Sequence, residues 1–298
     1  MFLAIEIGGT KLQLGVGSGG GPPLAELVRE GVVRERGAAA IREQIARLAR
    51  PLIEKHRVTA VGIGFGGPVD VEEGRIIKRH HVEGWDDFPL ADWCRENLGL
   101  PAAVGNDSDL AGLGEATFGA GQGHRVVFYS NVGTGIGGAL VIDGQLYRGG
   151  SGVASEIGHL RPGLDAERPD AILESLASGW GITRAAREQA LGLDTAADVA
   201  AAAAAGNEAA RRVFDDACRA YGWALAQMIT LLAPNAVVIG GGVSLAGEDV
   251  FFAPLRRYVD RYVFPPHKGT YRIVPSALGD EVVLHGALAI AGQCEPLS

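Results

Sequence analysis

The sequence predicts an α/β protein built of two domains, and three observations lead to this prediction. Apolar segments typical of buried strands alternate with segments whose apolar residues recur at helical spacing, which is the pattern of an α/β fold. Two turns rich in glycine and threonine, Glu6–Lys11 and Asn131–Gly138, lie far apart in the chain, and each is flanked by apolar segments. A chain of 298 residues is long enough to bury two modest cores.

The elements predicted for the first half begin with a strand at the second residue. The segment Gly17–Pro23 is expected to be a loop. A helix is indicated further on, because Ile41, Ile45, Leu48 and Leu52 share one helical face. The other expected elements are the strands Phe2–Ile7, Leu12–Val16, Ala60–Phe65 and Ala102–Val104, and the helices Leu90–Leu98 and Ser108–Phe118.

The second half is expected to begin after the glycine-rich segment Gly119–His124, which we interpret as a hinge between domains 1–118 and 119–298. A long helix over Glu208–Leu232 ends before Pro234, as helices do. Its inner side is expected to carry Val213, Ala217, Ala224 and Met228. The last helix of the chain is compatible with packing back on the first domain. The other expected elements are the strands Val126–Tyr129, Ala139–Ile142 and Ala236–Ile239 and a helix over Thr183–Ala205.

Composition and charge exclude several classes of protein. A hydrophobic content of 47% with 21% charged residues is ordinary for a globular chain, and a net charge of −8 argues against nucleic-acid binding. The 3 cysteines are scattered and form neither a disulfide framework nor a metal motif. No apolar run reaches membrane-spanning length and a strand is expected from residue 2, so we expect a cytoplasmic enzyme without a signal peptide.

Both glycine–threonine turns are candidate phosphate sites. Between two strands, such a turn directs backbone N–H groups and a hydroxyl to one place, which suits phosphate oxygens. The alternative is a plain tight hairpin in which glycine only supplies an unusual φ. Gly133, Gly135 and Gly138 also match G-x-G-x-x-G, but that dinucleotide motif must open a helix. Here a strand and an Asp143–Gly144 hairpin turn follow, so the dinucleotide interpretation fails.

Four polar residues are candidates for chemistry on a substrate. Asp107 follows a short strand and precedes a helix, so it either caps that helix, as Ser108 could, or acts as a general base for an attacking hydroxyl. Glu156 and His159, in a glycine-rich loop, either bind neighbouring sugar hydroxyls or are solvated loop residues. Glu174 is by itself an ordinary helix glutamate.

Glu6 stands at the first turn, where a carboxylate beside phosphate is unfavourable unless a cation lies between them. This position implies Mg²⁺ held through water, because Mg²⁺ keeps most of its waters in proteins. Lys11 either neutralises phosphate or simply begins the next strand.

In this order and spacing, the motifs resemble the ROK family (repressor, open reading frame, kinase) of sugar kinases. The resemblance extends from Phe2 to about Ala291, and each motif alone is weak. The matching segments are E-I-G-G-T-K at 6–11, G-F-G-G-P-V-D at 64–70, G-W-D-D-F-P-L at 84–90, G-N-D at 105–107, N-V-G-T-G-I-G-G at 131–138, E-I-G-H at 156–159, L-E-S-L-A-S-G at 173–179 and P-N-A-V-V-I-G-G-G-V at 234–243.

The resemblance implies a two-domain actin-like ATPase (ribonuclease H-like) α/β fold with a hinge and a central cleft, in a homodimer that uses ATP and Mg²⁺. It implies that Asp107 is the catalytic base. The residues implied at the sugar are Gly66, Gly67, Asn106, Asp107, Glu156, His159 and Glu174. The residues implied at the nucleotide are Gly8, Gly9, Thr10, Lys11, Gly133, Thr134, Gly135, Gly137, Gly241 and Gly242.

Two positions depart from the pattern of the family. Its first phosphate motif usually begins with Asp, whereas this chain has Glu6, whose extra methylene would shift a metal-bound water. The cysteines of its zinc motif are replaced by Asp165, Glu167 and Ile172. Because structural zinc favours Cys and His ligands, we predict that the protein binds no zinc.

The function expected from this resemblance is an ATP- and Mg²⁺-dependent glucokinase that forms glucose 6-phosphate. Another hexose (fructose, mannose or an N-acetylated hexosamine) and polyphosphate as the donor stay open, since pocket shape decides the sugar. A sugar sensor of weak activity is an alternative that Glu6 keeps open. A sugar-responsive repressor is disfavoured, because no helix-turn-helix precedes the first phosphate motif and the net charge is −8. We expect no nucleic-acid and no membrane partner.

Overall fold

The computed structural model describes residues 1–33, 36–77, 82–163 and 170–295, and the chain divides into two compact units. Unit 1 comprises residues 1–122, 148–153 and the C-terminal part from residue 278. Unit 2 comprises residues 123–147 and 154–277. The chain therefore returns to unit 1 at its end, so that the last helix, α9 (Val282–Ala291), belongs with the N-terminal strands.

Each unit contains a five-stranded sheet, and the two sheets have the same topology. The strand orders are β3-β2-β1-β4-β7 and β10-β9-β8-β11-β12. In both sheets the first three strands form an antiparallel meander. A fourth strand pairs in parallel with the first strand of that meander, and a fifth strand pairs in parallel with the fourth. The two similar halves suggested by the paired turns are thus confirmed.

The strands match the predicted ones closely where the sequence is apolar. In unit 1 they are β1 (Phe2–Ile7), β2 (Lys11–Gly17), β3 (Glu26–Gly31), β4 (Ala60–Phe65) and β7 (Ala102–Asn106), with a small hairpin of β5 (Val69–Asp70) and β6 (Arg75–Ile76). In unit 2 they are β8 (Val126–Val132), β9 (Ile136–Ile142), β10 (Gln145–Tyr147), β11 (Ala236–Gly240) and β12 (Arg272–Pro275). The edge strand β3 was not predicted, because its sequence E-L-V-R-E-G carries three charged residues and lacks an apolar run.

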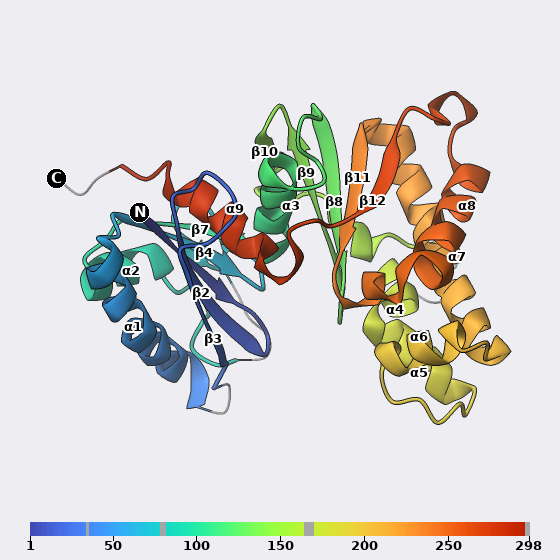
Figure 1. The fold of residues 1–298 in the computed structure, drawn as a ribbon, viewed down its shortest axis with the longest axis horizontal. Helices are drawn as coiled ribbons and strands as arrows, with labels where there is room; N and C mark the ends of the chain where they lie inside the picture. Colours follow the sequence, from blue (N-terminus) through green and yellow to red (C-terminus); the bar gives the residue numbers. More distant parts are fainter. Residues whose placement is uncertain (34–35, 78–81, 164–169, 296–298) are drawn as a thin grey trace. The chain divides into compact units, whose positions relative to one another are not determined.

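The two faces of the unit 1 sheet are covered differently. Leu3, Ile5 and Ile7 of β1 point into a core shared with α1 (Gly37–His56) and α2 (Leu90–Leu98). The opposite face carries glycines, and α9 packs directly on it, since a Cβ on Gly62 would lie 1.9 Å from the Ala287 carbonyl oxygen. In Figure 1, α9 is the red helix beside the blue N-terminal strands, and it also packs against α3 (Asp107–Phe118). Glu6 alternates with Ile5 and Ile7, so it points to the α9 face.

A long helix, α7 (Glu208–Leu232), organises the core of unit 2. Its N-cap is Asn207, whose side chain accepts hydrogen bonds from two backbone amides, and its C-cap is Ala233, immediately before Pro234. The predicted inner side is confirmed, because Val213, Ala217, Ala224 and Met228 are all buried. The other helices of this unit are α4 (Leu173–Ala177), α5 (Gly179–Glu188), α6 (Ala196–Ala204) and α8 (Ala253–Tyr262), with the short turns η2 (Ile157–His159), η3 (Gly242–Ala246), η4 (Glu248–Phe252) and η5 (Pro265–His267). No helix in the ranges that the structure describes is both long and apolar enough to span a membrane.

One predicted helix, over Thr183–Ala205, is wrong, because the structure divides this stretch into α5 and α6. Ala190 and Gly192 take φ angles of 54° and 67°, which a helix cannot accommodate. Thr195 then starts α6 with a reciprocal capping box to Asp198. The alanine-rich composition predicted helix throughout, and it masked the stop and restart between the two helices.

Candidate functional site

Asn106 and Asp107 lie where β7 ends and α3 begins, at the carboxyl edge of the parallel strands of unit 1. Asn106 is the N-cap of α3, since its Oδ1 accepts hydrogen bonds from the amides of Ser108 (2.8 Å) and Asp109 (3.3 Å). The capping role considered for Asp107 or Ser108 therefore falls to Asn106. Its Nδ2 donates to the carbonyl of Gly67 at 3.1 Å, and the second N–H of Asn106 has no acceptor among the residues that the structure describes, so it is available to a ligand.

The carboxylate of Asp107 lies against the loop that follows β4. Its Oδ1 accepts a hydrogen bond from the amide of Ser108 at 2.7 Å, and a Cβ added to Gly66 would lie 3.2 Å from its Oδ2. The structure therefore brings Gly66, Gly67, Asn106 and Asp107 together, as the resemblance implies. A carboxylate held at the edge of the sheet in this way is of the type that accepts a proton from a neighbouring hydroxyl.

The first turn closes the β1–β2 hairpin. The amide of Gly8 donates to the carbonyl of Lys11 at 2.9 Å, and Gly9 and Thr10 are exposed. Gly8 has no left-handed φ, and a Cβ added to it would lie 3.0 Å from the Lys11 carbonyl oxygen. A side chain at this position would thus be tightly packed against the backbone of Lys11, and the hairpin alternative based on unusual φ fails for Gly8.

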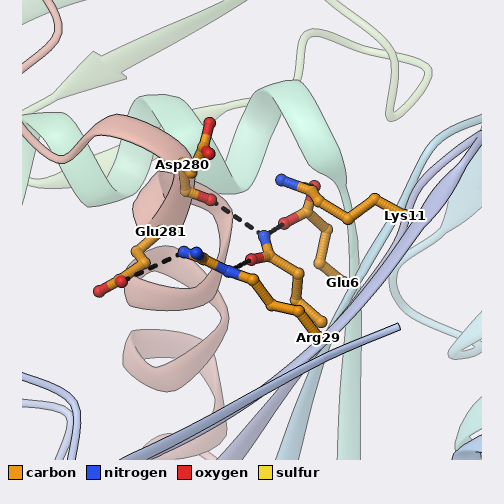
Figure 2. Close-up of polar contacts among 6 residues, drawn as sticks. Glu6, Lys11, Arg29, Asp280 and Glu281 are labelled. Atoms are coloured by element: carbon orange, nitrogen blue, oxygen red, sulfur yellow. Dashed lines mark hydrogen bonds and ion pairs between the residues drawn. The ribbon is translucent and has the colours of Figure 1, made fainter. Parts of the chain in front are cut away.

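Glu6 is buried beside this turn, with only 9% of its surface exposed. Lys11 Nζ lies 3.6 Å from its Oε1, and Gln13 Nε2 donates to its Oε2 at 2.6 Å (Figure 2). Burial raises the pKa of Glu6 above its ordinary value, Lys11 and the Gln13 amide lower it, and the charge of Asp280 raises it. Mg²⁺ that keeps most of its waters is usually bound through one or two carboxylates and the phosphates of its substrate, so the single carboxylate of Glu6 is compatible with Mg²⁺ held through water.

The second turn is the three-residue segment Gly133–Gly135 between β8 and β9. The first two amides of α5, on Gly179 and Trp180, donate to the carbonyls of Gly133 (2.7 Å) and Thr134 (3.4 Å). The free amides at a helix start thereby hold the turn in place. Gly137 lies within β9, and its amide donates to Asn131 Oδ1 at 2.8 Å, so this N–H is already used inside the hairpin.

Glu174, on α4, joins the second turn to the loop that carries the candidate sugar ligands. Its Oε2 accepts a hydrogen bond from the amide of Ile136 at 2.8 Å. Gly135 packs directly on it, because a Cβ there would lie 2.4 Å from Oε2. Glu174 is therefore more than a helix glutamate, and its second oxygen, Oε1, is the atom that could bind a sugar hydroxyl.

Glu156 is the N-cap residue of the short turn η2 and His159 is its last residue, and this turn is pressed against β9. A Cβ added to Gly158 would lie 2.2 Å from a backbone oxygen of β9, so glycine is required for this contact. Partial burial raises the pKa of Glu156, His159 lowers it, and Glu174 raises it. His159 and Glu174 therefore both lie close enough to act on the charge of Glu156, and unit 2 places near one another the three residues that the resemblance implies at the sugar.

A cavity of about 580 Å³ opens beside the second turn in unit 2. Gly133, Thr134 and Gly242 line it, and a Cβ on Gly242 would meet only open space. Gly241 has a φ of 88°, and a Cβ there would lie 2.6 Å from the backbone of Val132, so only glycine fits. Of the two predicted glycines, Gly242 thus lines the cavity, and Gly241, the residue before it, packs against the end of β8.

Sequence reasoning missed the rest of the cavity wall. The residues concerned include Trp180, Thr183 and Arg187 of α5, and Asp194 and Thr195 directly before α6. Trp180 is 53% exposed, and the guanidinium of Arg184 lies 4.8 Å from the centre of its ring. An exposed tryptophan directly after the Ser178–Gly179 motif was the signal available in the sequence, whereas the Asp194–Thr195 loop offered none.

The predicted absence of zinc concerns a segment that lies largely outside the described residues. Asp165 and Glu167 belong to the part that the structure does not describe, and Ile172 is the N-cap residue of α4. Across the described ranges, no group of three or more His, Cys, Asp and Glu residues could hold a metal ion. The zinc-free state stays a prediction.

Comparisons with known proteins agree with this geometry. The ROK family model matches residues 2–294. The glucokinase of Thermotoga maritima is 32% identical over 97% of this chain and 96% of its own length. The ROK glucokinase of Streptomyces griseus, solved with glucose and AMPPNP, is 31% identical and aligns with a TM-score of 0.83 over 98% of this chain and 99% of its own. The ROK hexokinase of Thermus thermophilus is 30% identical, with a TM-score of 0.83 over 98% of both chains.

Proposed function

The chain belongs to the ROK family, and from this premise we propose that it is an ATP-dependent hexose kinase that converts glucose to glucose 6-phosphate. Support comes from the glucokinases to which it is similar over nearly its whole length. The observation that carries the proposal is the placement of Asp107, fixed by the Ser108 amide and packed against Gly66 at the end of β7.

In the proposed reaction, Asp107 accepts the proton of the sugar hydroxyl as that oxygen attacks the terminal phosphorus of ATP. Phosphoryl transfer depends on positioning and charge stabilisation, so the base has only to orient the hydroxyl and take up its proton. The remaining N–H of Asn106 in unit 1 orients the sugar. Glu156, His159 and Oε1 of Glu174 in unit 2 bind further hydroxyls.

The phosphates of ATP are proposed to bind Thr10 and Lys11 in unit 1 and the Gly133–Gly135 turn in unit 2. The cavity next to that turn has room for a nucleoside, and the exposed face of Trp180 offers a stacking surface to a base. This cavity favours ATP over polyphosphate, because polyphosphate carries no group that would fill it.

Glu6 is proposed to hold Mg²⁺ through water, with Asp280 nearby. When bound, the ion would neutralise charge on the phosphates. We further propose that the protein is a homodimer, as the family resemblance implies. We also propose that it binds no zinc, because other residues replace the cysteines of the family's zinc motif.

A coupled assay of ADP release over a panel of sugars tests the function. Glucose, mannose, fructose, N-acetylglucosamine and N-acetylmannosamine are each supplied with ATP, and glucose is also supplied with polyphosphate. We expect the highest kcat/KM for glucose with ATP. No turnover with any sugar would refute the kinase assignment, and a higher kcat/KM for another hexose would correct the substrate. Turnover with polyphosphate equal to that with ATP would refute the assignment of the cavity.

A further inference from the structure

A row of polar side chains crosses three strands on the α9 face of the unit 1 sheet. Glu6 on β1 is directly opposite Gln13 on β2, and Gln13 is directly opposite Arg29 on β3. Residues paired in this way point to the same face. The row ends at Glu281, the residue immediately before α9. Oε1 of Glu281 lies 3.3 Å from Arg29 Nη2 (Figure 2).

Gln13 is the centre of this row and is fully buried, with 0% of its surface exposed. Its Oε1 accepts a hydrogen bond from Arg29 Nε at 2.5 Å. Its Nε2 donates to Glu6 Oε2 at 2.6 Å and to the Asp280 carbonyl at 3.0 Å. Both N–H groups and the oxygen of the amide are therefore in use.

These partners determine which way the amide of Gln13 faces. Both neighbours of its nitrogen, on Glu6 and Asp280, are oxygens that can only accept, and the neighbour of its oxygen, on Arg29, can only donate. Rotating the amide by half a turn would place an oxygen against two oxygens and an NH₂ group against a guanidinium. Arg29 and the start of α9 thus leave Gln13 one orientation, in which it donates to Glu6.

The consequence for Glu6 is that its two oxygens are no longer equivalent. Oε2 accepts the hydrogen bond from Gln13, and Oε1 is the oxygen that lies next to Lys11 at the first turn. A buried carboxylate without such a donor would lose part of its solvation and its fixed direction. Lys11 and Asp280 are the charged groups that act directly on Glu6, and Arg29 and Glu281 act on it through Gln13.

We propose that Gln13 is a positioning residue, which Arg29 orients in turn, and that it directs Oε1 of Glu6 to the magnesium ion of the bound nucleotide. This inference rests on the proposed function, because it assumes that Mg·ATP binds at the first turn. It assigns a task to Gln13, Arg29 and Glu281, which the family motifs quoted above do not include.

The test replaces Gln13 by methionine, which has a similar length and shape but neither donates nor accepts in the manner of an amide. The matched control is Gln44→Met in the same unit. Gln44 is also buried, and its Nε2 also donates to a glutamate oxygen (Glu30, 2.8 Å) and to a backbone carbonyl (Gly31, 2.9 Å). Both variants lose the two hydrogen bonds that the amide nitrogen donates, and Gln13→Met also loses the bond that its Oε1 accepts from Arg29. Only the set around Gln13 involves Glu6.

The readout is the affinity for AMPPNP measured by calorimetry in the presence and absence of Mg²⁺, with the KM for glucose measured alongside. In Gln13→Met we expect the gain in affinity due to Mg²⁺ to fall about tenfold or more, as for loss of one hydrogen bond to a charged group. In the same variant, the affinity for AMPPNP in the absence of Mg²⁺ and the KM for glucose are expected to stay the same. Gln44→Met retains the full gain.

A double variant separates positioning from general stability. Because Gln13 acts through Glu6, Glu6→Gln combined with Gln13→Met is expected to lose no more of the Mg²⁺-dependent gain than Glu6→Gln alone. Additive losses, an unchanged gain in Gln13→Met, or an unchanged gain in Glu6→Gln would each overturn the proposal. If Gln13→Met does not fold, Arg29→Gln gives the same test, since Arg29 is partly exposed and its loss leaves the buried core intact.

The result distinguishes this proposal from the proposed function. If the unmodified protein phosphorylates glucose and the Gln13 variant keeps its Mg²⁺-dependent gain, the positioning role is wrong and the kinase assignment stands. If the unmodified protein has no kinase activity with any sugar, the function fails, and the calorimetric comparison with AMPPNP still decides whether Gln13 acts on the metal.

Discussion

Replacing Asp107 by asparagine is expected to reduce turnover strongly while leaving the fold almost unchanged. The N-cap of α3 is Asn106, so the cap survives, and an asparagine oxygen can still accept the Ser108 amide now bound at 2.7 Å. The negative charge lost from the first turn of α3 is worth about 0.3–1 kcal/mol. Loss of a general base costs about 10²–10⁴ in rate, or about 3–5 kcal/mol of transition-state stabilisation. The effect on catalysis therefore exceeds the effect on stability by a clear margin.

The assay is coupled ADP release at saturating glucose and ATP, with the glucose dissociation constant and the thermal unfolding midpoint measured on the same preparations. Asp109→Asn is the matched control, because it removes the same charge from the same turn of α3. We expect the control to keep its turnover and Asp107→Asn to keep its glucose affinity. Turnover of Asp107→Asn within a few-fold of the unmodified protein, or an equal loss in the control, would refute the assignment of the base.

Gly135→Ala is expected to raise the KM for glucose about tenfold, because its Cβ would lie 2.4 Å from Glu174 Oε2 and displace a carboxylate that is held by one hydrogen bond; an unchanged KM would show that Glu174 does not bind the sugar. Ellman's reagent at pH 8 is expected to label one thiol per native chain, at Cys294, because Cys94 and Cys218 are buried whereas Cys294 is only partly buried. Burial raises the pKa of Cys94 and Cys218 to about 12 and also raises the pKa of Cys294, so labelling of Cys294 is expected to be slow. Labelling of either buried cysteine before unfolding would contradict this. Protein purified without chelators is expected to contain no stoichiometric zinc by elemental analysis, and activity lost to a zinc-selective chelator in excess Mg²⁺ would count against the zinc-free prediction.

Local sequence patterns were sufficient for the elements that build the two sheets. Phe2–Ile7 and Glu208–Leu232 were predicted with the bounds that the structure has, because an apolar run and a helical period with a following proline are local signals. The two glycine–threonine turns predicted two similar halves, and the matching strand orders confirm them. The position of Asp107 between a strand and a helix was sufficient to place it at the edge of the sheet.

By itself, the sequence thus determined the fold class and the family and led to the proposed site residues, since each depends on motifs whose order and spacing are visible along the chain. Only the tertiary structure decided how those residues are used. It made Asn106 the helix cap, engaged the amide of Gly137 within its own hairpin, and set Glu174 against the second turn. The hydrogen bond from Gln13 to Asp280 spans 267 positions in sequence, and it exists because strand register and the packing of α9 bring the two together. Such contacts depend on distances through space, which no local pattern records.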